Sequence, residues 1–262
     1  MSVRRALIPC GGKGTRMLAL SGGGPKELLR VGGVSALSRV ARECAASGIT
    51  ELLVVIAPGK EAIVEHLAPR AGERDMPKRI AFVEQPEPRG LADAIRLGRA
   101  FAAGAALGVA LPDNLFIGDR PALAQVIDRF VETGRNVVAV VEISADEAER
   151  RGPTSVLEGR LVGDAFEITR IPDKRERGDR FDTGGAASAF TGVGRYVLDA
   201  DAFDAIDQVE QDLPQGAELD DVPVMQQLLL EGRLTGRRVR GRFLDLGIPD
   251  GFREADQLLA SR

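Results

Sequence analysis

The stretch Ala6-Leu-Ile-Pro-Cys-Gly-Gly-Lys-Gly-Thr-Arg-Met17 opens with a short apolar run and continues into a loop dense in glycine and cationic residues. A second lysine follows at Pro25-Lys26, just before another apolar segment. Glycines let backbone N–H groups approach an anion closely, and cations with a nearby hydroxyl complete a cradle for phosphate oxygens. The stretch therefore predicts a strand that leads into a phosphate-binding loop.

The rest of the chain alternates apolar runs with amphipathic segments. The runs predict strands at residues 6–9, 52–57, 80–84, 108–111 and 136–143. Helical periodicity is found at residues 35–47, 60–67, 91–103, 121–132, 200–209, 222–231 and 250–260. The strands are rich in Val, Ile and Leu without alternation, which is typical of parallel strands buried on both faces. The sequence predicts an α/β fold with a Rossmann-like, doubly wound, mostly parallel sheet.

The pattern changes after residue 143. Ser144-Ala-Asp-Glu147 has the spacing of a capping box and predicts a short helix. Strand-like pieces at 154–157 and 165–171 precede a charged, glycine-rich stretch that ends near residue 185. We expect residues 150–195 to form a small annex inserted over the sheet, and residues 238–245 to form a further strand.

The composition excludes several classes of protein. With 262 residues, 44% of them hydrophobic and 28% charged, the chain fits a globular protein with a large core. An aromatic content of 4% and a net charge of −4 argue against a nucleic-acid-binding surface. The apolar runs are too short for a membrane span or a secretion signal. We therefore expect a cytoplasmic, soluble protein without nucleic-acid or membrane partners.

Cysteine and histidine are too rare to build a site. Cys10 and Cys44 cannot supply a disulfide framework or a zinc site, and His66 is the single histidine. A His-based triad and a multi-histidine metal site are therefore excluded. Cys10 lies at the mouth of the glycine loop, where we expect a small, half-buried thiol rather than a nucleophile.

The spacing of the glycine loop separates it from two better-known phosphate loops. The dinucleotide-binding fingerprint needs a glycine at the position of Met17. The P-loop needs Ser or Thr directly after its Gly-Lys pair, whereas in this chain Gly14 follows Lys13. The pattern Gly11-Gly12-x-Gly14-Thr15-Arg16, with Pro25-Lys26 downstream, resembles the signature of the sugar-1-phosphate nucleotidylyltransferases. It is most similar to the glucose-1-phosphate uridylyl- and thymidylyltransferase branch of that family.

The resemblance implies a single nucleotidylyltransferase domain over residues 1–262, with the fold of the nucleotide-diphospho-sugar transferases. Residues 1–149 would bind the nucleotide, and residues 150–225 would bind the sugar phosphate. Residues 226–262 would supply a closing strand, with a metal-binding aspartate, and the C-terminal helix.

The resemblance also implies how the nucleotide is held. The triphosphate would lie against Gly11, Gly12, Gly14, Thr15 and Arg16. Gln85 and Gly90 resemble the base-reading segment of the family, and a carboxamide offers a donor and an acceptor that match the O4 and N3–H edge of uracil and thymine. Gln85 follows a predicted strand, and ligands of open parallel sheets bind beyond the carboxyl ends of the strands.

Catalysis would depend on cations and carboxylates. The resemblance implies Arg16, Lys26 and Asp113 as catalytic residues, with Lys26 bridging the α-phosphate and the acceptor phosphate. Asp113 and Asp245 resemble the two metal-binding aspartates of the family. Mg²⁺ takes few protein ligands together with substrate phosphates and water, so it is the expected cofactor.

The acceptor side departs from the family pattern. We expect the acceptor to be bound by Lys26, Asn114, Gly152, Arg170, Lys174 and Glu218. The family usually carries Glu-Lys-Pro where this chain has Arg170-Ile171-Pro172. Either a neighbouring cation such as Lys174 holds the acceptor phosphate, or the acceptor is not an ordinary hexose 1-phosphate.

The expected activity is transfer of a nucleotidyl group from UTP or dTTP to a sugar 1-phosphate, with release of pyrophosphate. One alternative keeps the fold but takes a cyclitol phosphate or phosphonate as acceptor, or another NTP. A second alternative is a nucleotide-sugar-binding regulatory protein without catalysis. The partners would be small molecules, and assembly into a homo-oligomer is compatible with the sequence.

Overall fold

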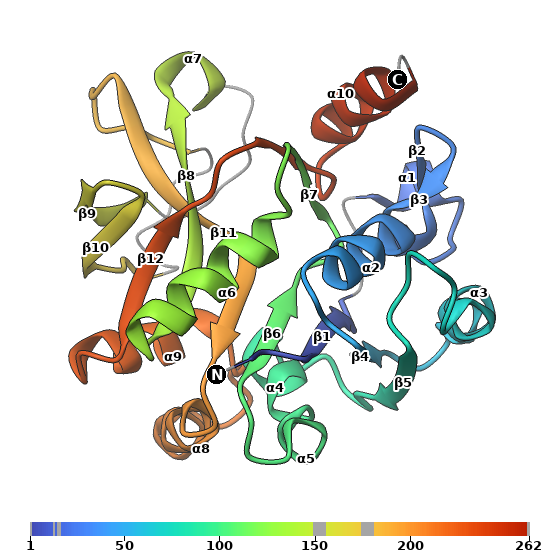
Figure 1. Cartoon of the computed structure of the whole chain (residues 1–262), viewed down its shortest axis with the longest axis horizontal. Helices are drawn as coiled ribbons and strands as arrows, with labels where there is room; N and C mark the ends of the chain where they lie inside the picture. The colour runs from blue at the N-terminus through green and yellow to red at the C-terminus, as the bar shows by residue number, and fades with distance from the viewer. Residues whose placement is uncertain (1, 13, 15–16, 149–155, 174–180, 261–262) are drawn as a thin grey trace.

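A mixed nine-stranded sheet runs through the part of the chain that the computed structural model describes, which is residues 2–12, 14, 17–148, 156–173 and 181–260 (Figure 1). In spatial order its strands are β5 (Arg79–Glu84), β4 (Glu51–Ile56), β1 (Arg5–Cys10), β6 (Leu107–Ala110), β11 (Ser188–Leu198), β8 (Asn136–Ser144), β12 (Leu234–Arg238), β10 (Ala165–Arg170) and β9 (Val156–Val162). Two short antiparallel pairs lie outside it: β2 (Arg30–Val31) with β3 (Val34–Ser35), and β7 (Asn114–Ile117) with β13 (Arg242–Asp245).

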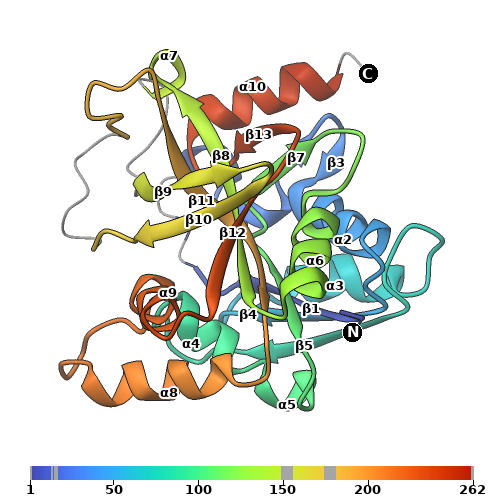
Figure 2. The same ribbon diagram turned by 60° about the vertical axis from the view of Figure 1, so that its left-hand side comes forward.

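Helices cover both faces of the sheet (Figures 1 and 2). They are α1 (Leu18–Ser21), α2 (Ala36–Ala46), α3 (Glu61–Leu67), α4 (Leu91–Arg96), α5 (Arg99–Ala102), α6 (Ala122–Thr133), α7 (Ala145–Ala148), α8 (Ala202–Asp212), α9 (Asp221–Leu230) and α10 (Pro249–Ala260), with 3₁₀ turns η2 (Lys26–Leu28) and η3 (Ala68–Arg70). Ala6 and Ile8 of β1 belong to one core with α2, α3, α6 and α10. Leu7 belongs to a second core with α4, α5, α8 and α9. Successive side chains of a strand point to opposite faces, so the unalternated apolar run of β1 serves both cores.

The strand directions agree with the predicted fold class. β5, β4, β1 and β6 pair in parallel, and β12 is parallel to β8. β11 pairs antiparallel with both β6 and β8, and β10 pairs antiparallel with β12 and β9. The prediction of a doubly wound, mostly parallel α/β sheet is therefore confirmed.

The segment expected to lie over the sheet extends the sheet instead. β11 fills the position between β6 and β8, and the hairpin β9–β10 continues the sheet beyond β12, on the left in Figure 1, where β9 also pairs antiparallel with β11. The expectation of an annex over the sheet at 150–195 is wrong in this respect. The physical reason is that β6 and β8 each present a row of backbone donors and acceptors, which β11 pairs on both sides.

Three local predictions have different outcomes. The helix expected at 91–103 is divided into α4 and α5, because the chain turns at Gly98, where a Cβ would lie 2.8 Å from Leu7 Cδ1. The single strand expected at 238–245 is wrong, since β12 belongs to the large sheet and β13 pairs with β7. The short helix after Ser144 is confirmed as α7. Ser144 and Glu147 exchange the two capping-box hydrogen bonds, from each backbone N–H to the other side chain, at 3.3 Å.

The topology brings several strand ends to one place. β1 lies between β4 and β6, and the chain first builds β4 and β5 on one side of it before returning to β6 on the other. Ligands of open α/β sheets bind at such a switch point, beyond the carboxyl ends of the strands. The glycine loop follows β1, Gln85 follows β5, and Asp113 lies between β6 and β7.

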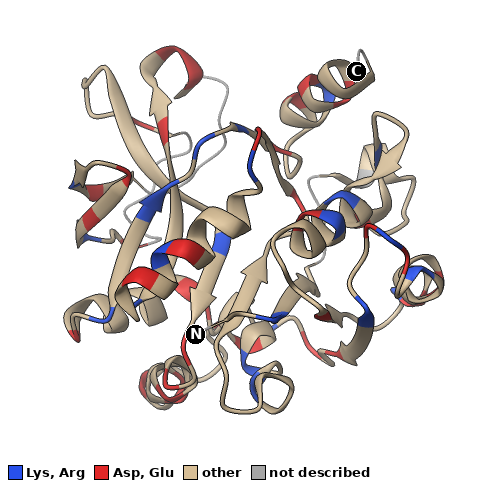
Figure 3. Cartoon of the chain, viewed as in Figure 1, with Lys and Arg blue, Asp and Glu red and all other residues tan. Residues whose placement is uncertain are grey.

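Charges of both signs are interspersed over the elements (Figure 3), as the totals of 35 Lys and Arg and 39 Asp and Glu suggest. Among the described residues, every helix is too short or too polar to cross a membrane.

Candidate active site

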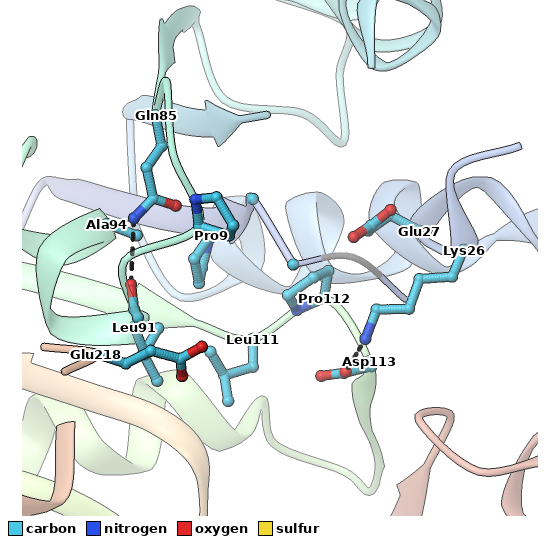
Figure 4. Close-up of a pocket in the computed structure, with 14 residues that line it drawn as sticks. Pro9, Lys26, Glu27, Gln85, Leu91, Ala94, Leu111, Pro112, Asp113 and Glu218 are labelled. Carbon is cyan, nitrogen blue, oxygen red and sulfur yellow. Dashed lines mark hydrogen bonds and ion pairs between the residues drawn. The ribbon is translucent and has the colours of Figure 1, made fainter. Parts of the chain in front are cut away.

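A cavity of about 370 Å³ lies beyond the carboxyl ends of β1, β5 and β6. Its lining consists of Pro9, Gly11, Gly12, Lys26, Glu27, Gln85, Pro88, Gly90, Leu91, Ala94, Leu111, Pro112, Asp113 and Glu218. Figure 4 shows Lys26 and Asp113 facing each other at one end of this cavity, with Gln85 at the other end. A second hollow of about 360 Å³ lies beside it and shares Gly11, Gly12 and Lys26. The predicted strand-end residues are thus brought together.

The glycine loop separates the two ends of the cavity. A Cβ at Gly11 would lie 2.4 Å from Gln85 Oε1, so only glycine leaves room for that amide. Gly14 has a φ of +64°, and a Cβ there would lie 3.3 Å from Lys26 Cγ. The described part of the loop therefore packs against Gln85 on one side and against the stem of Lys26 on the other. Thr15 and Arg16 lie outside the described residues, and their phosphate-binding and catalytic roles stay predictions.

Lys26 and Asp113 form an ion pair in which Lys26 Nζ donates to Asp113 Oδ2 at 2.5 Å. Burial is the largest single influence and disfavours the charge on Lys26, but the carboxylates of Asp113, Glu27 and Asp245 together outweigh it and raise the pKa of Lys26 above its ordinary value. The lysine is therefore a cation at neutral pH. A cation held in this way at the rim of a cavity can contact phosphate oxygens of a bound ligand.

Asp245 lies beside Asp113 because β7 and β13 pair antiparallel, with Asp245 opposite Asn114. Gly247 N–H donates to Asp245 Oδ1 at 2.9 Å. A Cβ built on Gly247 would lie 3.0 Å from Asp245 Oδ1 and 3.4 Å from Asp113 Oδ2. The two carboxylates thus flank one point, as the sequence predicts. The described residues hold no cluster of three or more metal-ligating side chains, so a metal here would take its other ligands from substrate and water.

The segment that carries Asp113 is anchored by the buried side chain of Arg195, a residue of β11. Arg195 forms a two-pronged ion pair with Glu43, at 2.9 and 2.7 Å. It also donates to the carbonyls of Leu111 and Asn114, at 3.1 and 2.7 Å. Burial disfavours the charge on Arg195, but the hydrogen-bonded Glu43 carboxylate favours it, and the pKa of Arg195 lies above its ordinary value. The guanidinium therefore fixes the backbone on both sides of Asp113.

Asn114, which is expected to bind the acceptor, forms hydrogen bonds with Asp113 and with Gly194 of β11. Its Nδ2 donates to Asp113 Oδ1 at 3.3 Å, and its Oδ1 accepts from the Gly194 N–H at 2.9 Å. These contacts orient the Asp113 carboxylate. A direct contact of Asn114 with an acceptor stays a prediction.

Gln85 is buried and its amide has a defined orientation. Its Nε2 donates to the Gly90 carbonyl at 3.2 Å and to Asp93 Oδ2 at 2.7 Å. Its Oε1 lies on the opposite side, toward Pro9 in Figure 4. The expectation that this carboxamide offers both a donor and an acceptor to a base therefore changes: both amide hydrogens are used internally, and only the oxygen is presented.

Gly90 caps the N-terminus of α4 with a φ of +112°, and a Cβ there would lie 2.3 Å from the Leu219 carbonyl oxygen. The Leu219 carbonyl accepts hydrogen bonds from Ala92 and Asp93 N–H, at 3.0 and 3.2 Å. This close approach places Glu218 in the lining of the cavity, beside the expected base-reading segment. A late part of the chain is thereby brought to the nucleotide side.

Two residues that the sequence analysis did not single out, Lys60 and Glu27, form hydrogen bonds that hold the glycine loop in place. Lys60 Nζ donates to the carbonyls of Cys10 and Gly12, each at 2.7 Å, and to Glu27 Oε1 at 2.9 Å. The Glu27 side chain is 1% exposed, and its Oε2 lacks a hydrogen-bond partner among the described residues. The signals were present, since Glu27 directly follows Lys26 and Lys60 follows the turn after β4. Their contacts span distant parts of the chain and could not be read from spacing.

We expect Lys60→Met to weaken binding of a triphosphate ligand at the glycine loop by about tenfold, because it removes a cation that holds two carbonyls of this loop. The midpoint of thermal unfolding should also fall, since Glu27 is left as a buried carboxylate without its partner. In the double variant Lys60→Met/Glu27→Gln the midpoint should recover in part while the weak binding persists. Equilibrium titration and thermal unfolding measure both effects. Unchanged affinity of Lys60→Met for the triphosphate ligand would contradict this role.

Of the other residues expected to bind the acceptor, which are Gly152, Arg170, Lys174 and Glu218, only Glu218 is found among the described residues that line the cavity. Arg170 lies at the end of β10, exposed, and donates to Glu158 Oε1 at 2.6 Å. Gly152 and Lys174 lie outside the described residues. The acceptor-binding roles of Arg170, Gly152 and Lys174 stay predictions, while Glu218 lies where such a role is feasible.

The two cysteines and the histidine take no part in the site. Cys10 is fully buried rather than half-buried, and burial raises its pKa well above the ordinary value. Burial likewise raises the pKa of Cys44 to about 12. His66 Nε2 lies 2.9 Å from the hydroxyls of Ser35 and Ser38, away from the cavity lining. Neither thiol is a nucleophile at neutral pH.

Comparison with known proteins places the chain among nucleotide-handling enzymes. A family model described as "Nucleotidyl transferase" matches residues 5–262. The chain is 30% identical over 268 residues to a Bacillus subtilis (strain 168) protein named "Putative UTP--glucose-1-phosphate uridylyltransferase", covering 95% of this chain and 94% of that one. It is 28% identical to a UTP–glucose-1-phosphate uridylyltransferase of Mycoplasma pneumoniae, covering 97% and 91%. A solved UDP-glucose pyrophosphorylase, complexed with UDP-glucose, superposes with a TM-score of 0.81 at 20% identity over 99% of each chain.

Proposed function

Because this chain belongs to the nucleotidyl transferase family, we propose that it transfers a uridylyl group from UTP to a sugar 1-phosphate, with glucose 1-phosphate as the first candidate. One observation carries the proposal. The Gln85 oxygen and the Lys26–Asp113 pair lie at opposite ends of a single cavity of about 370 Å³ (Figure 4). The names of the Bacillus subtilis and Mycoplasma pneumoniae relatives support UTP and glucose 1-phosphate as substrates.

The chemistry requires positioning more than proton transfer. An oxygen of the acceptor phosphate attacks the α-phosphorus of UTP, the bond between that phosphorus and the bridging oxygen breaks, and pyrophosphate leaves with the electron pair. A phosphate monoester has a second pKa of about 6, so the attacking group is already an anion at neutral pH. No general base is needed, which agrees with a cavity that lacks histidine. Catalysis then consists of aligning two polyanions and neutralising charge.

Lys26 is the residue we assign to this neutralisation. Its ammonium lies between the glycine loop and Asp113 and is held by a 2.5 Å ion pair. From there it would contact the α-phosphate and the acceptor phosphate together. The β- and γ-phosphates would extend into the second hollow, lined by Gly12, Gly14 and Gly24. Arg16 would add a second cation there.

Asp113 and Asp245 are the residues that would hold Mg²⁺. Their carboxylates flank Gly247, and carboxylates with substrate phosphates are the ligands that Mg²⁺ prefers. A bound Mg²⁺ would supply charge neutralisation at the α-phosphorus. Lys26 forms an ion pair with Asp113 in this structure. The lysine and the metal-binding carboxylate would therefore lie beside the same phosphate.

One observation favours a second candidate with a different acceptor. Arg170 and Ile171 stand where the family usually has Glu and Lys, and Arg170 is paired with Glu158. A cyclitol phosphate or a phosphonate would need a different set of contacts on this side. The donor nucleotide and the direction of attack would be the same in both cases.

A matrix of substrates tests the proposal. Pyrophosphate release would be measured with UTP, dTTP, CTP and GTP against a panel of hexose 1-phosphates, cyclitol phosphates and phosphonates, with Mg²⁺. We expect release with UTP and glucose 1-phosphate, and a smaller rate with dTTP. Release only with an acceptor that is not a hexose would favour the second candidate. Binding of nucleotide without release from any pair would favour a regulatory protein.

A further inference from the structure

Asp93 is a buried carboxylate in the first turn of α4, and the proposed reaction assigns it no part. Its side chain is 6% exposed and accepts a hydrogen bond from Gln85 Nε2 at 2.7 Å. We propose that Asp93 is a positioning residue that fixes the Gln85 amide and thereby decides which nucleobase the site accepts. This inference rests on the proposed nucleotidyl transfer.

The contacts around Gln85 allow one amide orientation. Nε2 donates to the Gly90 carbonyl at 3.2 Å as well as to Asp93. A backbone carbonyl and a carboxylate can only accept hydrogen bonds, so both partners require the nitrogen on their side. Turning the amide by half a rotation would set Oε1 against two acceptors in a buried place, which is unfavourable. Oε1 therefore stays on the side of the glycine loop, beside Gly11.

Asp93 itself is held from two sides. The Leu219 carbonyl accepts its backbone N–H at 3.2 Å, which anchors the start of α4. Arg96 Nη2 donates to Asp93 Oδ1 at 2.8 Å, and Arg89 Nη1 lies 4.0 Å from the same oxygen. Both arginines also contact Glu210 of α8. The arginines compensate the buried carboxylate and leave its second oxygen to Gln85.

An amide that presents only its oxygen discriminates between pyrimidines. Uracil and thymine carry an N3–H donor, whereas N3 of cytosine is an acceptor. The N3–H of uracil can donate to Gln85 Oε1, but cytosine would bring two acceptors together without a proton. Uracil and cytosine have nearly the same size, so the difference in this edge, and not shape, separates them.

Asp93→Asn is the variant that tests this inference. The Asn amide nitrogen can donate to Gln85 Oε1, which allows the Gln85 amide to turn and present Nε2 to the cavity. We expect the ratio of kcat/KM for UTP over CTP to fall at least ~10-fold, since a site built around one hydrogen bond discriminates by orders of magnitude. The ratio of UTP and CTP binding constants should fall in parallel. Asp93→Ala removes the acceptor without adding a donor, so its ratios should lie between those of the wild type and Asp93→Asn.

Two comparisons separate positioning from a general loss of structure. Asp207→Asn changes an aspartate of α8 that pairs with Arg99 at 2.6 Å, and it should leave both ratios within about twofold. In a Gln85→Leu background, adding Asp93→Asn should leave the ratios unchanged, because the amide through which it acts is gone. Thermal unfolding of each variant shows that it is folded.

The outcomes distinguish the inference from the proposed function. If the wild type neither binds UTP nor prefers it to CTP, the proposed function fails. If the wild type prefers UTP, and folded Asp93→Asn and Asp93→Ala weaken UTP and CTP by the same factor, the positioning role of Asp93 is overturned while the function stands.

Discussion

Replacing Lys26 with alanine is expected to lower kcat by at least ~10²-fold, the scale of losing one electrostatic stabiliser of a transition state. The reason is that Lys26, which is hydrogen-bonded to Asp113 at 2.5 Å, would contact both the α-phosphate and the acceptor phosphate in the proposed reaction. The KM for UTP should change much less, because the base pocket and the glycine loop stay in place. Steady-state pyrophosphate release measures both constants.

The controls for Lys26→Ala address stability and charge. Lys26 and Asp113 are 19% and 25% exposed, so the pair is mostly buried and its loss leaves the Asp113 carboxylate without its cation. The midpoint of unfolding should therefore fall, and thermal unfolding shows whether Lys26→Ala is folded at the assay temperature. Lys78→Ala removes an exposed lysine and should keep wild-type turnover. Near-wild-type kcat in Lys26→Ala would show that another cation carries the role.

Asp113→Ala is expected to lower kcat by a similar factor, at least ~10²-fold, and to change the response to Mg²⁺. Asp113 is one of two carboxylates that flank Gly247, so its loss leaves Asp245 as the single carboxylate at that point. The Mg²⁺ concentration for half-maximal activity should rise by about tenfold or more. Activity measured over a Mg²⁺ titration tests this directly.

The matched control for this variant is Asp119→Ala, which removes an exposed aspartate on the loop after β7. It should leave both kcat and the Mg²⁺ response unchanged. Asp245→Asn should shift the Mg²⁺ response in the same direction as Asp113→Ala, since the two carboxylates share one point. An Asp113→Ala enzyme with the wild-type Mg²⁺ curve would remove Asp113 from the metal site.

Much of the fold follows from local pattern. The runs at 52–57 and 136–143 are buried on both faces and correspond to β4 and β8, within a few residues. The glycine-loop resemblance is confirmed by the family model that matches residues 5–262. These features were readable because side-chain periodicity and glycine spacing are properties of adjacent residues.

The features that the sequence reading missed depend on contacts between distant residues. β11 carries Gly192 and Gly194 and follows a charged stretch, so its place at the centre of the sheet was not visible. The clamp of Lys60 on two loop carbonyls and the orientation of the Gln85 amide are set by partners on other elements. Residue spacing does not encode which atom of an amide faces a cavity.

β11 has a mechanical consequence for how the enzyme could close around its substrates. Its C-terminal end is hydrogen-bonded to β6, and it is bonded to β8 along both parts of its length. Without β11, no strand would connect the group β5, β4, β1 and β6 to the group β8, β12, β10 and β9. With it, they form one continuous ladder. We therefore expect tightening around bound substrates to come from segments outside the sheet.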